Sequence, residues 1–531
     1  MPKRVFELLP VVLAVLVVSA CGGGGGGGGV TSGANASTPA AAPVWGQEAY
    51  VKAPNAGAGD QFGIGVAIDG DTLVVGALGE ASSQTTITNG TAASGDDSIA
   101  WAGAAYVFRR SGTNWVQEAY LKAPNAGNGD FFGESVAIDG DTVIVGASGE
   151  GSNQTTITNG ATASADNSAA SAGAAYVFKR TGTTWAQEAY LKAPNTGVGD
   201  EFGYSVAIAG DTIVVGAIAE DSNQTTITNG TTASGDDLAA DSGAAYVFKR
   251  TGSAWAQQAY LKAANAGAND QFGTSVAIYG DTVVVGALGE ASNQTTITNG
   301  ATASADDTAA AAGAAYVFKR TGSAWAQEAY LKAPNANAGD YFGVSVAIYG
   351  DTAVVGALGE ASSQTTITNG ATASANNLAA EAGAAYVFKR TGTTWASEAY
   401  LKAPNAEAGD FFGMSVALAG DIAVVGAPHE SSNRTTIING TSGSGDNSAA
   451  LAGAAYIFKR TGATWVQQAY LKAPNAESDD YFGTSVAVSG TTVVAGAHRE
   501  SSSQTDVTNG TTASADNSAL NAGAAYAFRY R

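Results

Sequence analysis

The chain has 531 residues and a formal net charge of −21, because 46 Asp and Glu outweigh 25 Lys and Arg. This balance excludes a nucleic-acid binder, which needs a basic surface. One Cys and two His residues exclude an internal disulfide framework, a Cys-rich metal site and a multi-His metal centre. A hydrophobic fraction of 45% excludes a disordered chain.

The N-terminus has the pattern of an export signal. Lys3 and Arg4 precede an apolar run that is too short to span a membrane comfortably, and small residues follow it. Val18-Ser19-Ala20-Cys21 resembles the lipobox of bacterial lipoproteins. The resemblance implies a signal peptide over residues 1–20, a lipid on Cys21, and attachment to the bacterial outer membrane, at the cell surface or on its periplasmic side. An ordinary signal peptide is the alternative.

Residues 21–44 are predicted to form a tether between the lipid and the folded body. Eight consecutive glycines are followed by a stretch rich in Ser, Ala, Thr and Pro. Such a segment has few side chains to bury, and its expected span is roughly 25–30 Å.

From residue 45 onward the chain consists of one repeated unit. Tryptophan recurs every 70 residues, at 45, 115, 185, 255, 325, 395 and 465. In repeat one, four segments rich in β-branched and aromatic residues are predicted strands: Phe62–Asp69, Thr72–Ala77, Ala104–Arg109 and Trp115–Lys122. Short Gly-containing turns make neighbouring strands antiparallel. Seven such units predict an all-β, seven-bladed β-propeller of four-stranded blades over residues 45–531.

The two ends of the repeated region predict how the ring closes. The last repeat stops at its third strand, whereas Trp45–Lys52 is a fourth strand without a blade of its own. Docking this first strand onto the last blade removes both open ends.

The residues that resemble a known family lie in the first two strands. Phe412-Gly413 followed by Gly426-Ala427-Pro428 matches an FG…GAP pattern, and the other six copies contain FG…GA. The chain therefore resembles the FG-GAP propellers of bacterial surface proteins and, more distantly, the head of integrin α subunits. The resemblance implies the fold more strongly than the function.

The strand order predicts two unlike faces. The plain face carries the short 1–2 and 3–4 turns, and the loop face carries the 2–3 loops and the links between blades. Within each 2–3 loop, an Asn-Gly pair between β-formers predicts a small hairpin, so seven hairpins should crown the loop face. Lys and Arg pairs end the third strands, where Asp71-type residues can partner them on the plain face. The loop face carries mainly acidic residues.

Calcium binding is a hypothesis for the loop face. The 1–2 connection, Asp69-Gly70-Asp71-Thr72, is too short to hold an integrin-type calcium loop. Oxygen ligands could come instead from Asn55, Asp60, Glu80, Asp96, Asp97 and their repeat equivalents. The alternative, which we favour, is that these residues bond their own loop backbone. Glu80 recurs in every repeat, which suggests a required hydrogen bond.

Few positions are unique enough to form an asymmetric site. His429, Arg434, His498 and Arg499 are predicted to form one basic cluster on the loop face of blades six and seven. Trp101 lies outside the repeat register and is either an exposed contact residue or partly buried under its loop. Because most positions recur sevenfold, we expect no catalytic centre.

Together these patterns predict a lipid-anchored cell-surface module for binding or adhesion. Its partner would be a protein or glycan, with calcium assistance as an open hypothesis; the membrane is contacted only through the lipid, and the oligomeric state is left open. The alternatives are a structural envelope or matrix protein with multivalent weak contacts, and a hydrolase.

Overall fold

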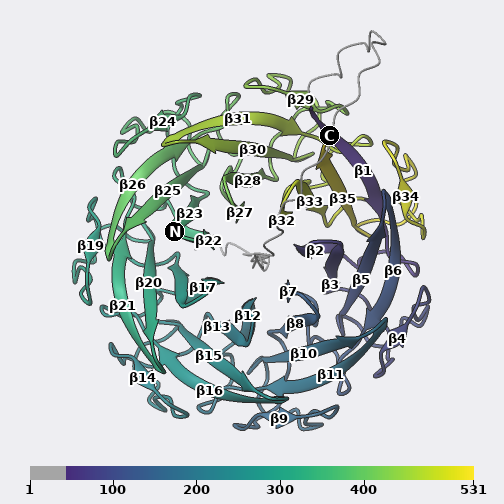
Figure 1. Cartoon of the computed structure of the whole chain (residues 1–531), viewed down its shortest axis with the longest axis horizontal. Helices are drawn as coiled ribbons and strands as arrows, with labels where there is room; N and C mark the ends of the chain where they lie inside the picture. Colours follow the sequence, from purple (N-terminus) through teal and green to yellow (C-terminus); the bar gives the residue numbers. More distant parts are fainter. Residues whose placement is uncertain (1–42) are drawn as a thin grey trace, which may run out of the picture.

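The computed structural model describes residues 43–531, so the predicted signal peptide, the lipidated Cys21 and nearly all of the tether lie outside the described residues. Seven antiparallel sheets surround a central axis, which confirms the predicted seven-bladed propeller (Figure 1). Each sheet has five strands rather than the four expected, because a two-residue strand is added at its outer edge. Among residues 43–531, no helix is long and apolar enough to cross a bilayer.

The strands of each blade follow one order from the axis outward. In blade one this order is β2 (Phe62–Asp69), β3 (Thr72–Ala77), β5 (Ala104–Ser111), β6 (Asn114–Leu121) and β4 (Thr88–Asn89). The other six blades, in the same axis-to-edge order, contain β7 (Val136–Asp139), β8 (Thr142–Ala147), β10 (Ala174–Thr181), β11 (Thr184–Leu191) and β9 (Thr158–Asn159); β12 (Phe202–Ala209), β13 (Thr212–Ala217), β15 (Ala244–Thr251), β16 (Ala254–Leu261) and β14 (Thr228–Asn229); β17 (Phe272–Tyr279), β18 (Thr282–Ala287), β20 (Ala314–Thr321), β21 (Ala324–Leu331) and β19 (Thr298–Asn299); β22 (Phe342–Tyr349), β23 (Thr352–Ala357), β25 (Ala384–Thr391), β26 (Thr394–Leu401) and β24 (Thr368–Asn369); β27 (Ser415–Ala419), β28 (Ile422–Ala427), β30 (Ala454–Thr461), β31 (Thr464–Leu471) and β29 (Ile438–Asn439); and β32 (Val486–Ser489), β33 (Thr492–Ala497), β35 (Ala524–Tyr530), β1 (Trp45–Val51) and β34 (Thr508–Asn509).

Small residues let the innermost strands approach one another. A Cβ atom added to Gly133 would lie 2.1 Å from the backbone oxygen of Ala104, so only glycine fits there, and its φ of 93° also favours glycine. Next to it, the hydroxyl of Ser135 donates a hydrogen bond of 2.7 Å to the backbone oxygen of Gly203 in the following blade. Farther out, the buried ring of Phe132 packs edge-on against Tyr176 and Phe178. The small and large residues thus follow the wedge shape of the gaps between blades.

The ring closes as the sequence predicted. Strand β1 pairs with β35, with Trp45 opposite Tyr530 and Val51 opposite Ala525. The amide of Val44 donates to the carbonyl oxygen of Arg531 at 2.6 Å, and the reverse bond measures 3.0 Å. The two ends of the repeated region therefore complete one blade together (Figure 1).

The seven predicted hairpins are not formed, and the Asn-Gly segments do not crown the loop face. Thr88 and Asn89 instead pair with Tyr120 and Ala119 of β6, and Gly90 donates to the carbonyl oxygen of Glu118 at 2.7 Å. The unsatisfied edge of the fourth strand captures this segment, since a paired backbone is more stable than an exposed edge. The short strands consequently lie at the perimeter of the disc (Figure 1).

At the perimeter, each Asn side chain joins its blade to the next one. Asn89 Oδ1 accepts from the backbone amide of Trp185 at 2.7 Å, and Asn89 Nδ2 donates to the carbonyl oxygen of Trp185 at 3.2 Å. The same pair of hydrogen bonds recurs at every seam between blades. The two seams that close the ring have it as well, between Asn439 and Trp45 and between Asn509 and Trp115. These side chains clamp neighbouring blades together.

Candidate functional site

The plain face is occupied by ion pairs that hold blades together. Arg180 lies 2.6 Å from Asp141 in its own blade and 3.0 Å from Glu118 in the preceding one. Its guanidinium also lies over the ring of Trp185, 5.2 Å from the centroid. The predicted partnership of the third-strand cations with Asp71-type residues is confirmed.

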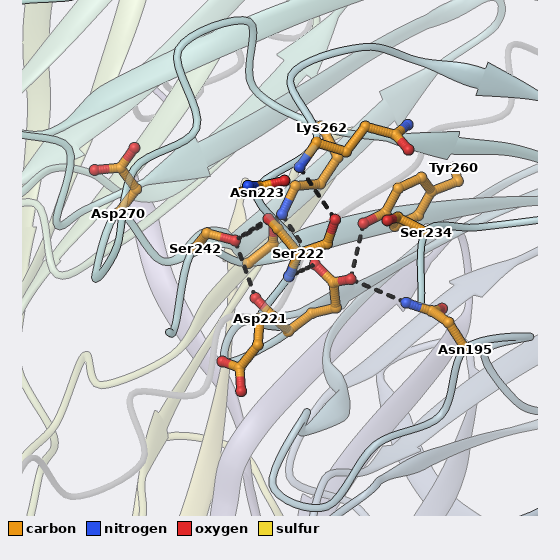
Figure 2. A network of polar contacts seen from close by, with 12 residues as sticks. Asn195, Asp221, Ser222, Asn223, Ser234, Ser242, Tyr260, Lys262 and Asp270 are labelled. Atoms are coloured by element: carbon orange, nitrogen blue, oxygen red, sulfur yellow. Dashed lines mark hydrogen bonds and ion pairs between the residues drawn. The ribbon is translucent and has the colours of Figure 1, made fainter. Parts of the chain in front are cut away.

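The loop face rests on a buried polar network in each blade, and Figure 2 shows the one around Lys262, Tyr260 and Asn195. Lys262 Nζ lies 2.9 Å from Glu220 Oε2 and 2.6 Å from the carbonyl oxygen of Gly243, while Tyr260 and Asn195 donate to Glu220 Oε1. Burial lowers the pKa of Lys262 and raises the pKa of Glu220, and their mutual attraction opposes both shifts. The required hydrogen bond inferred from the recurrence of Glu80 is therefore present in the structure.

Four of the five residues proposed as calcium ligands in repeat one form hydrogen bonds with other groups of the protein. In blade one, Glu80 accepts from Lys122 and Tyr120, and Asn55 turns its amide nitrogen, not its oxygen, toward Glu80. Asp60 is buried and accepts from the Gly57 amide at 2.7 Å. Asp96 accepts from the amide and hydroxyl of Ser83.

These residues do not fit a calcium site. Within residues 43–531, no three His, Cys, Asp or Glu side chains gather where one metal ion could bind them. Lys122 Nζ lies 2.8 Å from Glu80 Oε2 and 2.6 Å from the carbonyl oxygen of Gly103, so an ammonium group already occupies the position between these oxygens. The fifth residue, Asp97, is exposed.

Three of the four predicted basic residues meet in one sector of the loop face. The ring of His429 stacks on Phe411 at 4.1 Å and meets the edge of Tyr481 at 5.2 Å. Tyr481 in turn contacts His498 at 5.4 Å, and the Arg499 guanidinium lies 4.4 Å from its ring centroid. Aromatic rings, imidazole rings and one guanidinium group thus follow one another across blades six and seven.

This sector differs from the predicted cluster in its charge and in one member. Burial and the charge of Arg499 lower the pKa of His429 to about 4 and that of His498 to about 3. Both rings are therefore neutral at neutral pH, and Arg499 supplies the positive charge. Arg434 bonds to the carbonyl oxygen of Thr436 within its own loop and does not join the other three.

The aromatic sector belongs to a ring of backbone positions in the left-handed region. In every blade, the residue before the Phe-Gly pair has a φ between 53° and 58° and donates its amide to the carbonyl oxygen of a second left-handed residue from the preceding blade. We call these two sets the variable ring; they are Gln61, Phe131, Glu201, Gln271, Tyr341, Phe411 and Tyr481, and Trp101, Ser171, Asp241, Ala311, Glu381, Leu451 and Asn521. Non-glycine residues held in this conformation cost energy, and such strain is typical of functional positions.

One of the two sets in the variable ring differs in every repeat. Trp101 and its equivalents are seven different residue types, whereas Glu80 is Glu in all seven repeats. Trp101 itself is 40% exposed and contacts Phe131 edge-on at 5.9 Å. Aligning the repeats at their spacing of 70 reveals this variation, whereas the sequence of repeat one alone shows only an additional tryptophan.

An acidic sector lies across the axis from the aromatic one. Glu134 is buried near the start of the innermost strand of blade two, where it accepts a hydrogen bond from Ser148. Burial raises the pKa of Glu134 to about 8, with a further contribution from the negative charge of Glu201. Blades two and three face blades six and seven across the axis (Figure 1), so the carboxyl groups of Glu134 and Glu201 lie on the side of the loop face opposite the aromatic sector.

The fold and the repeated unit define a seven-bladed propeller built from one sequence motif. The chain belongs to the FG-GAP repeat family, whose model matches residues 45–108, 115–178, 185–248, 255–318, 325–388, 395–458 and 465–528.

Among solved structures, a hypothetical selenium-binding protein from Sulfolobus tokodaii is similar at 7% identity and a TM-score of 0.39, over 81% of this chain and 90% of that one. No curated protein matches the sequence.

Proposed function

We propose that this protein is an exported, lipid-anchored binding module that recognises a protein or glycan ligand through its loop face. The observation that carries the proposal is the variable ring. Repeats that keep the same residues in their buried networks carry different side chains at these positions, and a rigid framework holds each one in a strained backbone conformation.

The aromatic sector of blades six and seven is the proposed centre of recognition. Phe411 and Tyr481 are half-buried and held by their stacking contacts, so they lose little conformational freedom on binding. Aromatic and Arg side chains of this kind dominate the binding energy of protein surfaces. Arg499 adds a directional donor to a face whose other charges are mainly acidic.

The position of the anchor supports an outward-facing loop face. The chain enters the propeller at Val44, beside Arg531, on the plain face where the 3–4 turns lie. A tether attached there would direct the plain face toward the membrane and the loop face away from it. We further propose that the protein acts by binding and is not an enzyme, because most positions of residues 43–531 recur in every blade, whereas a catalytic centre needs distinct residues brought together once.

A binding screen tests this proposal. The full-length protein would be applied to glycan and surface-protein arrays, and hits would be measured again with Phe411→Ala, Arg499→Ala and Trp101→Ala. We expect at least one ring variant to weaken a specific interaction by about tenfold or more, which corresponds to about 1.4 kcal/mol. Leu378→Ala, an exposed residue outside the ring, serves as control. Unchanged binding in all three ring variants would contradict recognition by this ring.

A further inference from the structure

A cavity of about 420 Å³ opens on the plain face between blades two, three and four. Its lining includes Asp139, Ala209, Lys249, Tyr279, Gly280 and Arg320. It lies on the opposite face from the variable ring, and none of these residues takes part in the function proposed above.

At the end of the innermost strand, three repeats have a short side-chain oxygen that accepts a hydrogen bond from the next blade, and the other repeats do not. Asp69 Oδ2 accepts a hydrogen bond of 2.8 Å from the turn amide of Gly140 in the next blade, and Asp139 accepts from Gly210 in the same way. Ser489 does so for Gly70 at 3.0 Å. In blade three the equivalent residue is Ala209, whose methyl group cannot accept from Gly280. The equivalent residue is also alanine in blade six, Ala419, but only Ala209 lies between Asp139 and Tyr279 in this notch.

The walls of the notch offer donors and acceptors together. Lys249 Nζ has a long hydrogen bond of 3.4 Å to Thr212 and forms none of the ion pairs found among residues 43–531. Two carboxylates, Asp211 and Asp281, are paired with Arg250 and Arg320 yet keep about half of their surface exposed, 53% and 52%.

An aromatic side chain forms another wall. Tyr279 contacts Tyr349 at 4.8 Å between ring centroids, which fixes its orientation beside the notch. A pocket with an aromatic wall and a few fixed polar groups of both kinds is typical of a site for a small polar ligand.

We propose that this notch binds a neutral pyranose unit of a glycan. A sugar hydroxyl takes the place of the absent side-chain oxygen and accepts from Gly280 and Lys249. Other hydroxyls donate to Asp211 and Asp281, and the apolar face of the sugar ring packs on Tyr279. A neutral ligand fits because the local carboxylates are already paired and the chain as a whole carries a net charge of −21.

The repeats themselves supply a variant that closes the site without damaging the fold. Ala209→Asp should reproduce in blade three the contact that Asp139 makes in blade two, filling the notch while satisfying Gly280. Ala419→Asp is the matched control, because it makes the same substitution in blade six, outside the cavity. We expect both variants to melt no lower than the wild type.

Saturation-transfer NMR of the full-length protein would measure binding of glucose, galactose, mannose, N-acetylglucosamine, cellobiose and maltose, with glucuronic acid as the charged comparison. We expect saturable binding of at least one neutral sugar, weakened about tenfold or more by Ala209→Asp and by Tyr279→Ala and unchanged by Ala419→Asp. Binding of no neutral sugar, a preference for glucuronic acid, or binding that survives Ala209→Asp would overturn the proposal. These outcomes are independent of the loop-face variants.

Discussion

The buried networks and the variable ring lie within the same blades but follow opposite rules. The Glu–Lys pair has the same two residue types in every blade, from Glu80 with Lys122 to Glu500 with Lys52. Trp101 and its equivalents are a different residue type in every blade, and Gln61 and its equivalents are four types among seven blades. Because both sets share one backbone, the difference shows which residues each blade needs for folding and which positions remain free for recognition.

The largest expected effect comes from breaking a buried network. Glu220→Ala removes the acceptor of Lys262, Tyr260 and Asn195 and leaves a buried ammonium group without its partner. We expect a loss of about 3–5 kcal/mol in the free energy of unfolding, measured by guanidinium denaturation. Leu451→Ala in the variable ring should cost far less. Equal losses would remove the distinction between structural and variable positions.

The perimeter clamps should have a smaller effect. Asn229→Ala leaves the amide and carbonyl groups of Trp325 without their side-chain partners, and we expect a loss of about 1–3 kcal/mol in the same assay. Asn229→Asp retains the acceptor for the Trp325 amide but places a carboxylate oxygen against the Trp325 carbonyl oxygen, which repels it, so its loss should equal or exceed that of Asn229→Ala. Wild-type stability of Asn229→Asp would show that the hydrogen bond to the carbonyl is not part of the clamp.

Much of this framework could be predicted from the sequence, because it depends on the spacing of the repeats and on the number of strands in the last repeat. The Trp spacing and the incomplete last repeat were sufficient for the blade number and for the closure of β1 on β35. The Asn-Gly hairpins were predicted wrongly, because the preference of Asn-Gly for hairpin turns takes no account of the rest of the blade. Here the segment pairs with the open edge of the fourth strand, and Asn89 forms hydrogen bonds with the next blade.

The candidate site was less accessible to prediction. The meeting of His429, His498 and Arg499 followed from counting rare residues, but the aromatic rings between them did not. Phe411 and Tyr481 precede the Phe-Gly pair and look like ordinary strand residues in one repeat. Only the backbone conformation shows that they turn outward together with the residues of the preceding blade.

A pH experiment tests the loop-face carboxyls that were considered as metal ligands. Burial raises the pKa of Asp270 to about 7 from its ordinary value of 3.8. The folded protein therefore holds this proton more tightly than the unfolded chain, and the associated stability is full below pH 3.8 and lost as the pH rises through 7.

Asp270→Asn is neutral at every pH and can still accept from the Gly267 amide. We expect the variant to gain about 1 kcal/mol over the wild type at pH 8 and less at pH 5, in urea denaturation at both values. The exposed Asp237→Asn should show no such dependence. A gain that is the same at both pH values would contradict a raised pKa.

The seams between blades allow a still finer comparison. Gln258 stands where most repeats have Glu, and it receives bonds from Arg320 and Trp325. Gln258→Glu should form the ion pair seen elsewhere and add about 0.5–1 kcal/mol. Gln468→Glu makes the same change at the seam with blade seven, where Tyr530 replaces the Arg, so it should add nothing. Equal gains in urea denaturation would show that the Arg partner is not responsible.

Calcium should have the smallest effect. Lys122 holds its ammonium group between Glu80 and the carbonyl oxygen of Gly103, and its equivalents do so in the other blades. A calcium ion could reach these oxygens only by expelling a buried, fully bonded Lys side chain. We expect the melting temperature to be the same in millimolar calcium and in chelator. Since a ligand that binds the folded state raises the melting temperature, a rise with calcium would reveal a cation site that these contacts do not predict.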